Sequence, residues 1–318
     1  MKAVVIGGGS WGSVFSTLLA ASGHDVTLAC RDPEQARAIA ETGRNPRYLT
    51  EVDLSCIAAT TVGEAPFGEA DLVALAVPSR AFAEVAAALP GRSPVLILTK
   101  GLDPASGRRL SELVEGRPVA VLSGPNHAEE IAQGLPAASV VASADTALAE
   151  RLQHAVMSAT FRVYVNDDVI GVELCAAAKN VIALAAGGVD GLGLGDNAKA
   201  GLISRGLREM TRLGEACGAR PETFSGLAGM GDLVVTCWSR HSRNRRAGEL
   251  LVQGLTPDEA ACKIGMVIEG LTTAPVLRDL SRRLGIELPI TEAVCRVLTG
   301  TSPLELVSSL MAREPTSE

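Results

Sequence analysis

Residues 1–23 read MKAVVIGGGSWGSVFSTLLAASG. An aliphatic run at residues 3–6 leads into Gly7-x-Gly9-x-x-Gly12, and a helix-like amphipathic stretch follows until Gly23. Glycines at this spacing permit a tight turn, close approach of the backbone to a pyrophosphate, and packing of a helix on a strand. The N-terminus of the helix favours the anion. The stretch therefore predicts a dinucleotide-binding, Rossmann-type domain.

The residue at the end of the second predicted strand selects between the two nicotinamide cofactors. An NAD site usually carries Asp or Glu there to hold the ribose 2′-hydroxyl, whereas Arg accommodates a 2′-phosphate. This chain has Arg31, with Asp32 one residue later. We expect NADP(H), with NAD(H) as an alternative that Asp32 would serve. The simpler alternative is that Arg31 is an ordinary surface charge.

Short aliphatic runs recur through the first half of the chain, with helix-like stretches between most of them. They lie at residues 3–6, 26–30, 72–77, 95–98, 119–122, 138–142 and 161–165. Such continuous runs suit strands covered on both faces, which predicts an α/β fold with a doubly wound, mostly parallel sheet. After about Asn166, long Ala/Leu/Arg/Glu segments separated by Gly and Pro replace them. They predict a second, all-helical domain.

We place the domain boundary between residues 167 and 168. Residues 1–167 would form the dinucleotide-binding domain, and residues 168–318 the helical domain for substrate binding and catalysis. Asp167 or Asp168 is expected to cap the first helix of the second domain. The polar tail from Arg313 is expected to fray.

Composition excludes several classes of protein. A hydrophobic content of 47% with 20% charged residues is typical of a compact soluble chain. A net charge of −7 and an aromatic content of 3% argue against a nucleic-acid partner. The seven cysteines are scattered and never spaced as C-x-x-C, so we expect no metal and reduced thiols in a cytoplasmic protein. The first apolar segment is too short for a signal peptide or a membrane span, so no integral membrane association is expected.

Residues 169–186, VIGVELCAAAKNVIALAA, are almost all aliphatic or small, yet they contain Lys179 and Asn180. Their length, and the lack of Pro or of Gly after Gly171, predict a buried helix. A buried ammonium group costs several kcal/mol unless it is paired or its pKa falls. The stretch therefore indicates a functional lysine. The alternative is that Lys179 extends from a half-buried helix to solvent.

Small or polar loops follow three of the predicted strands, at residues 77–79, 99–102 and 123–128. An open parallel sheet binds its ligands at this edge, so the loops predict a crevice. Lys100 is the single cation among them and could reach a phosphate or a carbonyl oxygen, unless it is only a solvated loop lysine. His127 is a candidate general acid or base, with packing or helix capping as the alternative.

A second glycine-rich turn at residues 226–233 sets Asp232 at the start of an apolar turn, where a carboxylate can orient a lysine or a substrate hydroxyl. Further on, Ser242 is the predicted N-cap of the helix RNRRAGELL. Its hydroxyl, the free amides and Arg243 could converge on a small anion such as phosphate. The alternatives are a capping serine with solvated arginines, or a basic run for nucleic acid, which the composition disfavours. Glu269 is either a carboxylate at a helix N-terminus or a ligand to the cofactor.

In their order along the chain, these segments resemble the bacterial NAD(P)-dependent glycerol-3-phosphate dehydrogenase family. The resemblance covers nearly the whole chain. It is carried by GGGSWG at residues 7–12, NPRYL at 45–49, VPS at 77–79, TKGL at 99–102, SGPNHA at 123–128, AAAKNVIAL at 176–184, GLAGMGDLVVTC at 226–237, SRNRRAG at 242–248, IEG at 268–270 and LPITEAV at 288–294.

The resemblance implies reversible reduction of dihydroxyacetone phosphate to sn-glycerol 3-phosphate, the backbone for phospholipid synthesis, by a cytoplasmic homodimer. It implies Lys179 as the general acid/base. Besides Gly7, Gly9 and Gly12, the implied cofactor contacts are Ser10, Trp11, Arg31, Lys100, Ala128, Arg243, Val267 and Glu269. The implied substrate contacts are Lys100, Gly124, Asn126, Lys179, Asn180, Asp232, Ser242, Arg243 and Asn244. This chain departs from the common SGPSFA segment, because Asn126 and His127 replace a small hydroxyl and an aromatic residue.

Two other functions fit part of the same pattern. A 3-hydroxyacid or ketopantoate-type NADP-dependent dehydrogenase can combine a dinucleotide turn with a buried helical lysine, but it acts on carboxylates. A non-enzymatic NADP(H)-sensing module would explain the glycine turn, but it has no use for Lys179.

Overall fold

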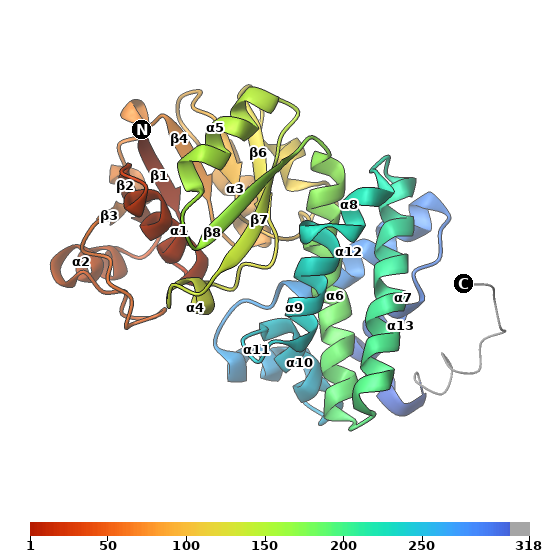
Figure 1. The fold of residues 1–318 in the computed structure, drawn as a ribbon. Helices are drawn as coiled ribbons and strands as arrows, with labels where there is room; N and C mark the ends of the chain where they lie inside the picture. Colours follow the sequence, from red (N-terminus) through yellow and green to blue (C-terminus); the bar gives the residue numbers. More distant parts are fainter. Residues whose placement is uncertain (306–318) are drawn as a thin grey trace.

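A single eight-stranded sheet forms the first half of the molecule in the computed structural model, which describes residues 1–305 (Figure 1). The strands are β1 (Lys2–Ile6), β2 (Asp25–Cys30), β3 (Ala58–Thr61), β4 (Leu72–Leu75), β5 (Val95–Ile97), β6 (Val119–Ser123), β7 (Ala137–Ala142) and β8 (Phe161–Asn166). Their order is β3-β2-β1-β4-β5-β6-β7-β8, and neighbouring strands are parallel except β6 and β7. The predicted mostly parallel, doubly wound sheet is confirmed.

Helices cover both faces of this sheet. They are α1 (Ser10–Ala21), α2 (Pro33–Thr42), α3 (Ser79–Ala87), α4 (Ala128–Ile131) and α5 (Thr146–Val156), with short 3-10 turns η1 (Val62–Glu64), η2 (Phe67–Glu69) and η3 (Leu110–Leu113). Side chains of β1 alternate between two cores, because successive residues of a strand point to opposite faces. Val5 packs in the core that contains Phe15 of α1. Val4 packs in the core that contains Phe82 of α3 and continues into the second half of the molecule.

The second half is helical, as predicted. Its elements are α6 (Val169–Gly191), α7 (Gly195–Ala216), α8 (Pro221–Ser225), a π-helical turn η4 (Leu227–Gly231), α9 (Asp232–Trp238), α10 (Arg243–Val252), α11 (Pro257–Ile264), α12 (Glu269–Leu284) and α13 (Pro289–Leu298). Asp168 caps α6, because its Oδ1 accepts a hydrogen bond from the amide of Gly171 at 2.9 Å. Since β8 ends at Asn166 and α6 begins at Val169, we keep 167/168 as our proposed boundary. The tail from Arg313 lies outside the described residues.

Helix α6 runs through the middle of the helical half, with the other helices packed around it (Figure 1). Its 23 residues are long and apolar enough to cross a membrane by length and composition alone, but 83% of its most apolar window is buried inside the protein. The surrounding helices supply the apolar environment that a membrane would otherwise provide. Helix α6 is therefore the core helix of its half, and it holds Lys179 in the interior.

Candidate active site

The carboxyl ends of β1, β4, β5 and β6 lie along one edge of the sheet, because these strands are parallel neighbours. The loops that leave this edge carry the glycine turn, Ser79, Lys100 and the segment from Gly124 to Ala128. Helices α6, α9, α10 and α12 of the second half face this edge through the contacts described below. The expected crevice loops are thus brought to the helical half.

Lys179 is buried in α6, with 5% of its surface exposed. Its Nζ donates to Asp232 Oδ1 at 2.6 Å and to Thr236 Oγ1 at 2.8 Å. Both partners lie on α9, where residues four apart share one face of the helix. Lys179 does not extend to solvent, so that alternative is wrong.

Lys100 binds the other oxygen of the same carboxylate. Its Nζ donates to Asp232 Oδ2 at 2.8 Å, to Asn126 Oδ1 at 2.7 Å and to the carbonyl of Gly124 at 3.0 Å. Burial is the largest influence on this ammonium, and Asp232 opposes it while Lys179 adds to it, so the pKa of Lys100 falls to about 7. The amide of Asn126 therefore serves as an acceptor for Lys100, and its Nδ2 donates to Ser139 Oγ at 3.1 Å.

Asp232 is the centre of the cluster and is 1% exposed. Burial acts to raise the pKa of Asp232, but the charges of Lys100 and Lys179 outweigh it and hold the pKa below its usual range. The carboxylate is set in place by the π-helical turn that precedes it. A Cβ at Gly229 would lie 2.0 Å from the carbonyl oxygen of Phe224, so this turn requires glycine.

Asn180 does not contact Lys179 through a hydrogen bond, although it is the next residue. Its Oδ1 accepts from Asn244 Nδ2 at 2.9 Å, and Asn244 Oδ1 accepts from the amide of Gly270 at 2.9 Å. Asn180 and Asn244 therefore join α6, α10 and the start of α12. A Cβ at Gly270 would lie 2.7 Å from the carbonyl oxygen of Asn180, which shows how closely these helices approach.

The predicted anion turn begins at Ser242, which is the N-cap of α10. Its Oγ accepts from the amide of Arg245 at 3.2 Å. Arg243 is exposed and donates from Nη1 to the carbonyl of Val267 at 3.0 Å. Glu269, at the first position of α12, accepts from the amide and the hydroxyl of Ser79 at 3.0 and 2.5 Å. Burial raises the pKa of Glu269, against the hydrogen bonds from Ser79. The contacts with Ser79 bring both carboxylate oxygens of Glu269 to the edge of the sheet, and the charge of Arg243 acts on the same carboxylate.

The glycine turn fits a dinucleotide. Gly7 has φ of +119°, and a Cβ at Gly12 would lie 1.9 Å from the carbonyl oxygen of Gly7. A Cβ at Gly9 would meet nothing within 4 Å, so the backbone there is open to a ligand. Helix α1 begins at Ser10 without a side-chain cap, and its free amides can receive a pyrophosphate. The neighbouring Trp11 packs against Phe15 and Phe161. Its buried indole Nε1 has no hydrogen-bond partner among the described residues.

The remaining predicted cofactor contacts lie near this turn or near the helical half. Arg31 is exposed and directly follows β2, and Ala128 is the buried first residue of α4. His127 occupies the N-cap position of α4, and its ring Nε2 is buried without a partner in residues 1–305. Burial, followed by the charge of Lys179, lowers the pKa of His127 to about 4. A ring that is neutral at pH 7 is a poor general acid.

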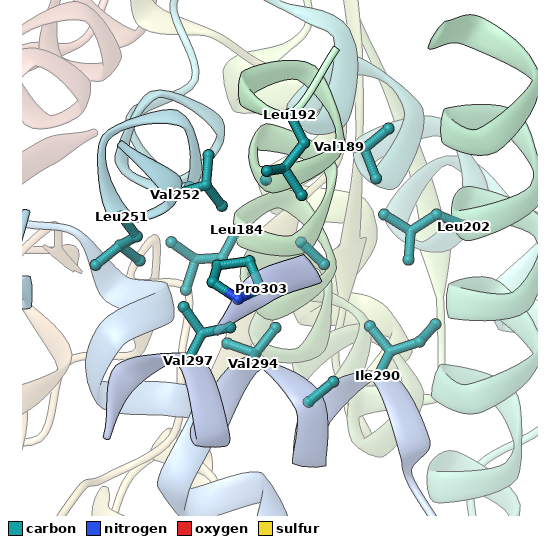
Figure 2. A pocket seen from close by; sticks show the side chains of 14 residues that line it. Leu184, Val189, Leu192, Leu202, Leu251, Val252, Ile290, Val294, Val297 and Pro303 are labelled. Carbon is teal, nitrogen blue, oxygen red and sulfur yellow. The ribbon is translucent and has the colours of Figure 1, made fainter. Parts of the chain in front are cut away.

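An apolar pocket of about 110 Å³ lies elsewhere, inside the helical half (Figure 2). It is lined by α6, α7, α10 and α13 with side chains such as Leu184, Leu202, Leu251 and Val294. None of the lining residues that the structure describes carries a charge, so they offer no charged group to a phosphate. Around the lysine cluster, by contrast, every group named above is polar. Within residues 1–305, no group of three or more His, Cys, Asp or Glu residues is placed to hold a metal ion.

Sequence reasoning missed Thr236 and the buried Asn45. Thr236 lies four residues after Asp232 in a predicted apolar turn, and this spacing was the signal that could have found it. Asn45 binds the carbonyl of Gly8 at 2.9 Å and so supports the glycine turn from a distant segment. Its role depends on tertiary packing that local pattern does not encode.

Comparison with known proteins agrees with this geometry. Residues 2–149 match the model for the N-terminus of NAD-dependent glycerol-3-phosphate dehydrogenase, and residues 168–308 match the model for its C-terminus. The NAD(P)+ glycerol-3-phosphate dehydrogenase of Moorella thermoacetica is 48% identical over 99% of this chain and 96% of its own length. That of Shouchella clausii is 44% identical over 98% of this chain and 96% of its own length. The crystal structure of glycerol-3-phosphate dehydrogenase from Coxiella burnetii superposes with a TM-score of 0.94 at 38% identity, covering 98% of this chain and 99% of its own.

Proposed function

This chain belongs to the NAD-dependent glycerol-3-phosphate dehydrogenase family, and from this premise we propose that it reduces dihydroxyacetone phosphate reversibly to sn-glycerol 3-phosphate. The observation that carries the proposal is the pair of lysines on one buried carboxylate, Lys179 and Lys100 on Asp232. This cluster lies where loops of the dinucleotide-binding sheet meet the helical half. It supplies a proton donor and positive charge in one place.

Lys179 is the general acid of this proposal. During reduction its Nζ donates a proton to the carbonyl oxygen of the substrate, and in the reverse reaction the neutral amine accepts that proton. When bound, a reduced nicotinamide supplies the hydride that the carbonyl carbon gains, so the ketone becomes a secondary alcohol. Thr236 and Asp232 hold the Lys179 amine in place through the bonds at 2.8 and 2.6 Å.

Lys100 adds positive charge beside the developing alkoxide. Charges fixed in a site that excludes water stabilise such a transition state more than they would in water. Its three acceptors, which include Asn126 and Gly124, hold the ammonium toward Asp232 and Lys179. Asn126 and Gly124 thereby line the substrate site in this proposal.

The start of α10 holds the substrate phosphate in this proposal. The unbonded amides at a helix N-terminus attract an anion, and Ser242 and Arg243 add a hydroxyl and a guanidinium. Asn244 and Asn180 bind each other and fix this end of α10 against α6. Binding of the phosphate, remote from the reacting carbon, orients the carbonyl for transfer.

The cofactor would lie across the glycine turn and extend to Lys100, Ala128, Arg243, Val267 and Glu269. We favour NADP(H) over NAD(H), because Arg31 directly follows β2 where a 2′-phosphate would lie.

We also propose a cytoplasmic location and a homodimer. The seven cysteines are free in the structure, which suits a reducing compartment. Light scattering coupled to size-exclusion chromatography would measure the mass of the assembly and so test the homodimer.

The experiment follows the absorbance of NADPH, and of NADH in parallel, with dihydroxyacetone phosphate, dihydroxyacetone or a 2-oxoacid added. We expect kcat/KM for dihydroxyacetone phosphate to exceed that for dihydroxyacetone by about 10² or more, because several charge-assisted hydrogen bonds to phosphate are lost. Preferential reduction of the 2-oxoacid would favour a 3-hydroxyacid or ketopantoate-type enzyme. Cofactor binding without consumption would favour a sensing module.

A further inference from the structure

Asp32 is occupied on both carboxylate oxygens. Its Oδ1 accepts from the amide of Glu34 at 3.0 Å and thereby caps α2. Its Oδ2 pairs with Arg47 Nη2 at 3.1 Å. An acidic residue selects NAD(H) by accepting hydrogen bonds from the ribose hydroxyls, and Arg47 competes with those hydroxyls for Asp32 Oδ2. Asp32 is therefore poorly available for that role.

Arg47 reaches this place because a buried amide holds its segment against the glycine turn. Asn45 is 1% exposed, and its Oδ1 accepts from the amides of Arg47 and Tyr48 at 3.1 and 3.2 Å. Its Nδ2 donates to the carbonyl of Gly8 at 2.9 Å and to Ser13 Oγ at 3.0 Å. These four hydrogen bonds tie the segment to itself, to the glycine turn and to α1.

The same segment contains backbone strain. Leu49 has φ of +50°, an arrangement that costs a non-glycine residue energy and persists where the surroundings impose it. Gln35 of α2 adds a second support, since its Nε2 donates to the carbonyl of Gly8 at 2.6 Å and to Asn45 Oδ1 at 3.1 Å. Residues 45–49 are thus fixed relative to both the glycine turn and the start of α2.

The side chains of Arg47 and Asp32 remain accessible, with 61% and 27% of their surfaces exposed. Arg31 is exposed and lies one residue before Asp32, which Arg47 contacts, so two arginines and one aspartate lie at the end of β2. This set has an excess of one positive charge. It suits the dianionic 2′-phosphate of NADP(H) better than the neutral diol of NAD(H).

We propose that Arg47 is a specificity-determining residue that binds the 2′-phosphate of NADP(H) together with Arg31 and withholds Asp32 from the ribose of NAD(H). The inference rests on the proposed function for its cofactor, and it assigns the preference to a residue outside the glycine turn. Removing Arg47 has two effects in the same direction, because it deletes a phosphate ligand and frees the Asp32 carboxylate.

The test uses calorimetric titration of the purified full chain with 2′,5′-ADP and with 5′-AMP, which needs no substrate and no turnover. Variants are Arg47→Ala and Arg31→Ala. The matched control is Arg44→Ala, because Arg44 directly precedes this segment and donates to the carbonyl of Glu51. We expect Arg47→Ala to weaken 2′,5′-ADP binding about tenfold or more, as loss of a charge-assisted hydrogen bond implies, while 5′-AMP binds as tightly as in the wild type or more tightly. Arg44→Ala should change neither affinity.

A kinetic readout separates recognition from folding. In Arg47→Ala the ratio of kcat/KM for NADPH to that for NADH should fall about tenfold or more, whereas a variant that merely loosens the segment would lose both cofactors together. The proposal is overturned if Arg47→Ala keeps wild-type affinity for 2′,5′-ADP, if both nucleotides weaken equally, or if the wild type binds 2′,5′-ADP no better than 5′-AMP. Failure of the proposed function would instead appear as no oxidation of either cofactor with dihydroxyacetone phosphate, while 2′,5′-ADP binding remains.

Discussion

The central residue of the site is Asp232, which shares one buried carboxylate between two ammonium groups. A buried cluster with one positive charge in excess is unfavourable by itself, because desolvation penalises the unpaired charge. The pKa of Lys100 is accordingly lowered to about 7, first by burial and further by the charge of Lys179. The arrangement becomes favourable when an anion arrives. It is therefore suited to a phosphorylated ketone whose oxygen gains negative charge during reduction.

This cluster predicts how the activity of the free enzyme depends on pH. Lys100 is charged below a pKa of about 7 and neutral above it, so kcat/KM for dihydroxyacetone phosphate should fall as pH rises through about 7. An anionic substrate favours the charged form, so the corresponding limb in kcat should lie at higher pH. Steady-state rates of NADPH oxidation between about pH 5.5 and about pH 9 would measure the limb in kcat/KM and the limb in kcat.

Two variants identify the titrating group. Lys100→Arg keeps its charge over this range and Lys100→Met has none, so the limb near pH 7 should be absent from both profiles. A limb that stays at the same pH in both variants would assign it to another group.

At the scale of elements, the π-helical turn η4 positions Asp232. Such turns are uncommon and are often found at functional sites. Here the turn is stabilised by close backbone packing, since a Cβ at Gly229 would overlap the carbonyl of Phe224 at 2.0 Å. Gly226, at the start of the same segment, is not crowded in this way, because its Cβ would lie 3.4 Å from the carbonyl of Thr223.

These two glycines provide a matched pair of substitutions. Gly229→Ala should displace the turn, lower kcat by about 10² through misplacement of Asp232, and lower the free energy of unfolding by about 2 kcal/mol. Gly226→Ala should change kcat and the free energy of unfolding little, because the backbone of Gly226 is extended, with φ of −85°. Urea unfolding and kinetics measure the two effects. If Gly229→Ala and Gly226→Ala had the same kcat and the same free energy of unfolding, the turn would not determine the position of Asp232.

Helix α10 gives a second test at this scale, because the side chain of Ser242 caps it and would also face the substrate phosphate. Thr256 caps α11 in the same manner through the amide of Glu259. Replacing either cap by Ala should lower the free energy of unfolding by about 1 kcal/mol. Only Ser242→Ala should also raise KM for dihydroxyacetone phosphate, by about tenfold. An unchanged KM in Ser242→Ala would remove the serine from the phosphate site.

At the scale of the whole molecule, the two halves are joined near the start of α6. Glu173 is buried on α6 and accepts from the amide and hydroxyl of Ser111 at 2.8 and 2.5 Å and from Arg109 at 3.0 Å. Ser111 and Arg109 belong to the segment that follows Lys100 in the sheet domain. Burial raises the pKa of Glu173 against these bonds. The contact sets the position of one catalytic segment relative to the helix of Lys179.

Glu173→Ala should lower the free energy of unfolding by about 3 kcal/mol, because it removes the buried acceptor of the partly buried Ser111 amide and hydroxyl and of the Arg109 guanidinium. The control is Glu112→Ala, which removes the more exposed ion pair of Arg109 and should cost at most about 1 kcal/mol. Thermal and urea unfolding compare the two. A Glu173 variant as stable as the control would mean that this contact does not join the halves.

Sequence predicted the elements whose signals are local. The glycine turn, the strands of aliphatic residues and the buried α6 all follow from short-range pattern. It missed β3, because AATT is a partly exposed edge strand without an aliphatic run. It suggested that Asp232 orients a lysine, but local pattern does not encode the contact itself, since 53 residues separate Lys179 from Asp232 and tertiary packing brings α6 against α9. The link from Asn45 to Gly8 has the same origin.

The most direct measurement of the central claim is the turnover of Lys179→Ala with saturating dihydroxyacetone phosphate and NADPH. Lys263→Ala, an exposed lysine of α11, serves as the control. We predict that kcat of Lys179→Ala falls by about 10² or more, while NADPH binding by fluorescence titration stays within about twofold of wild type. A folded Lys179→Ala protein that keeps more than about a tenth of wild-type kcat would contradict proton transfer by this lysine.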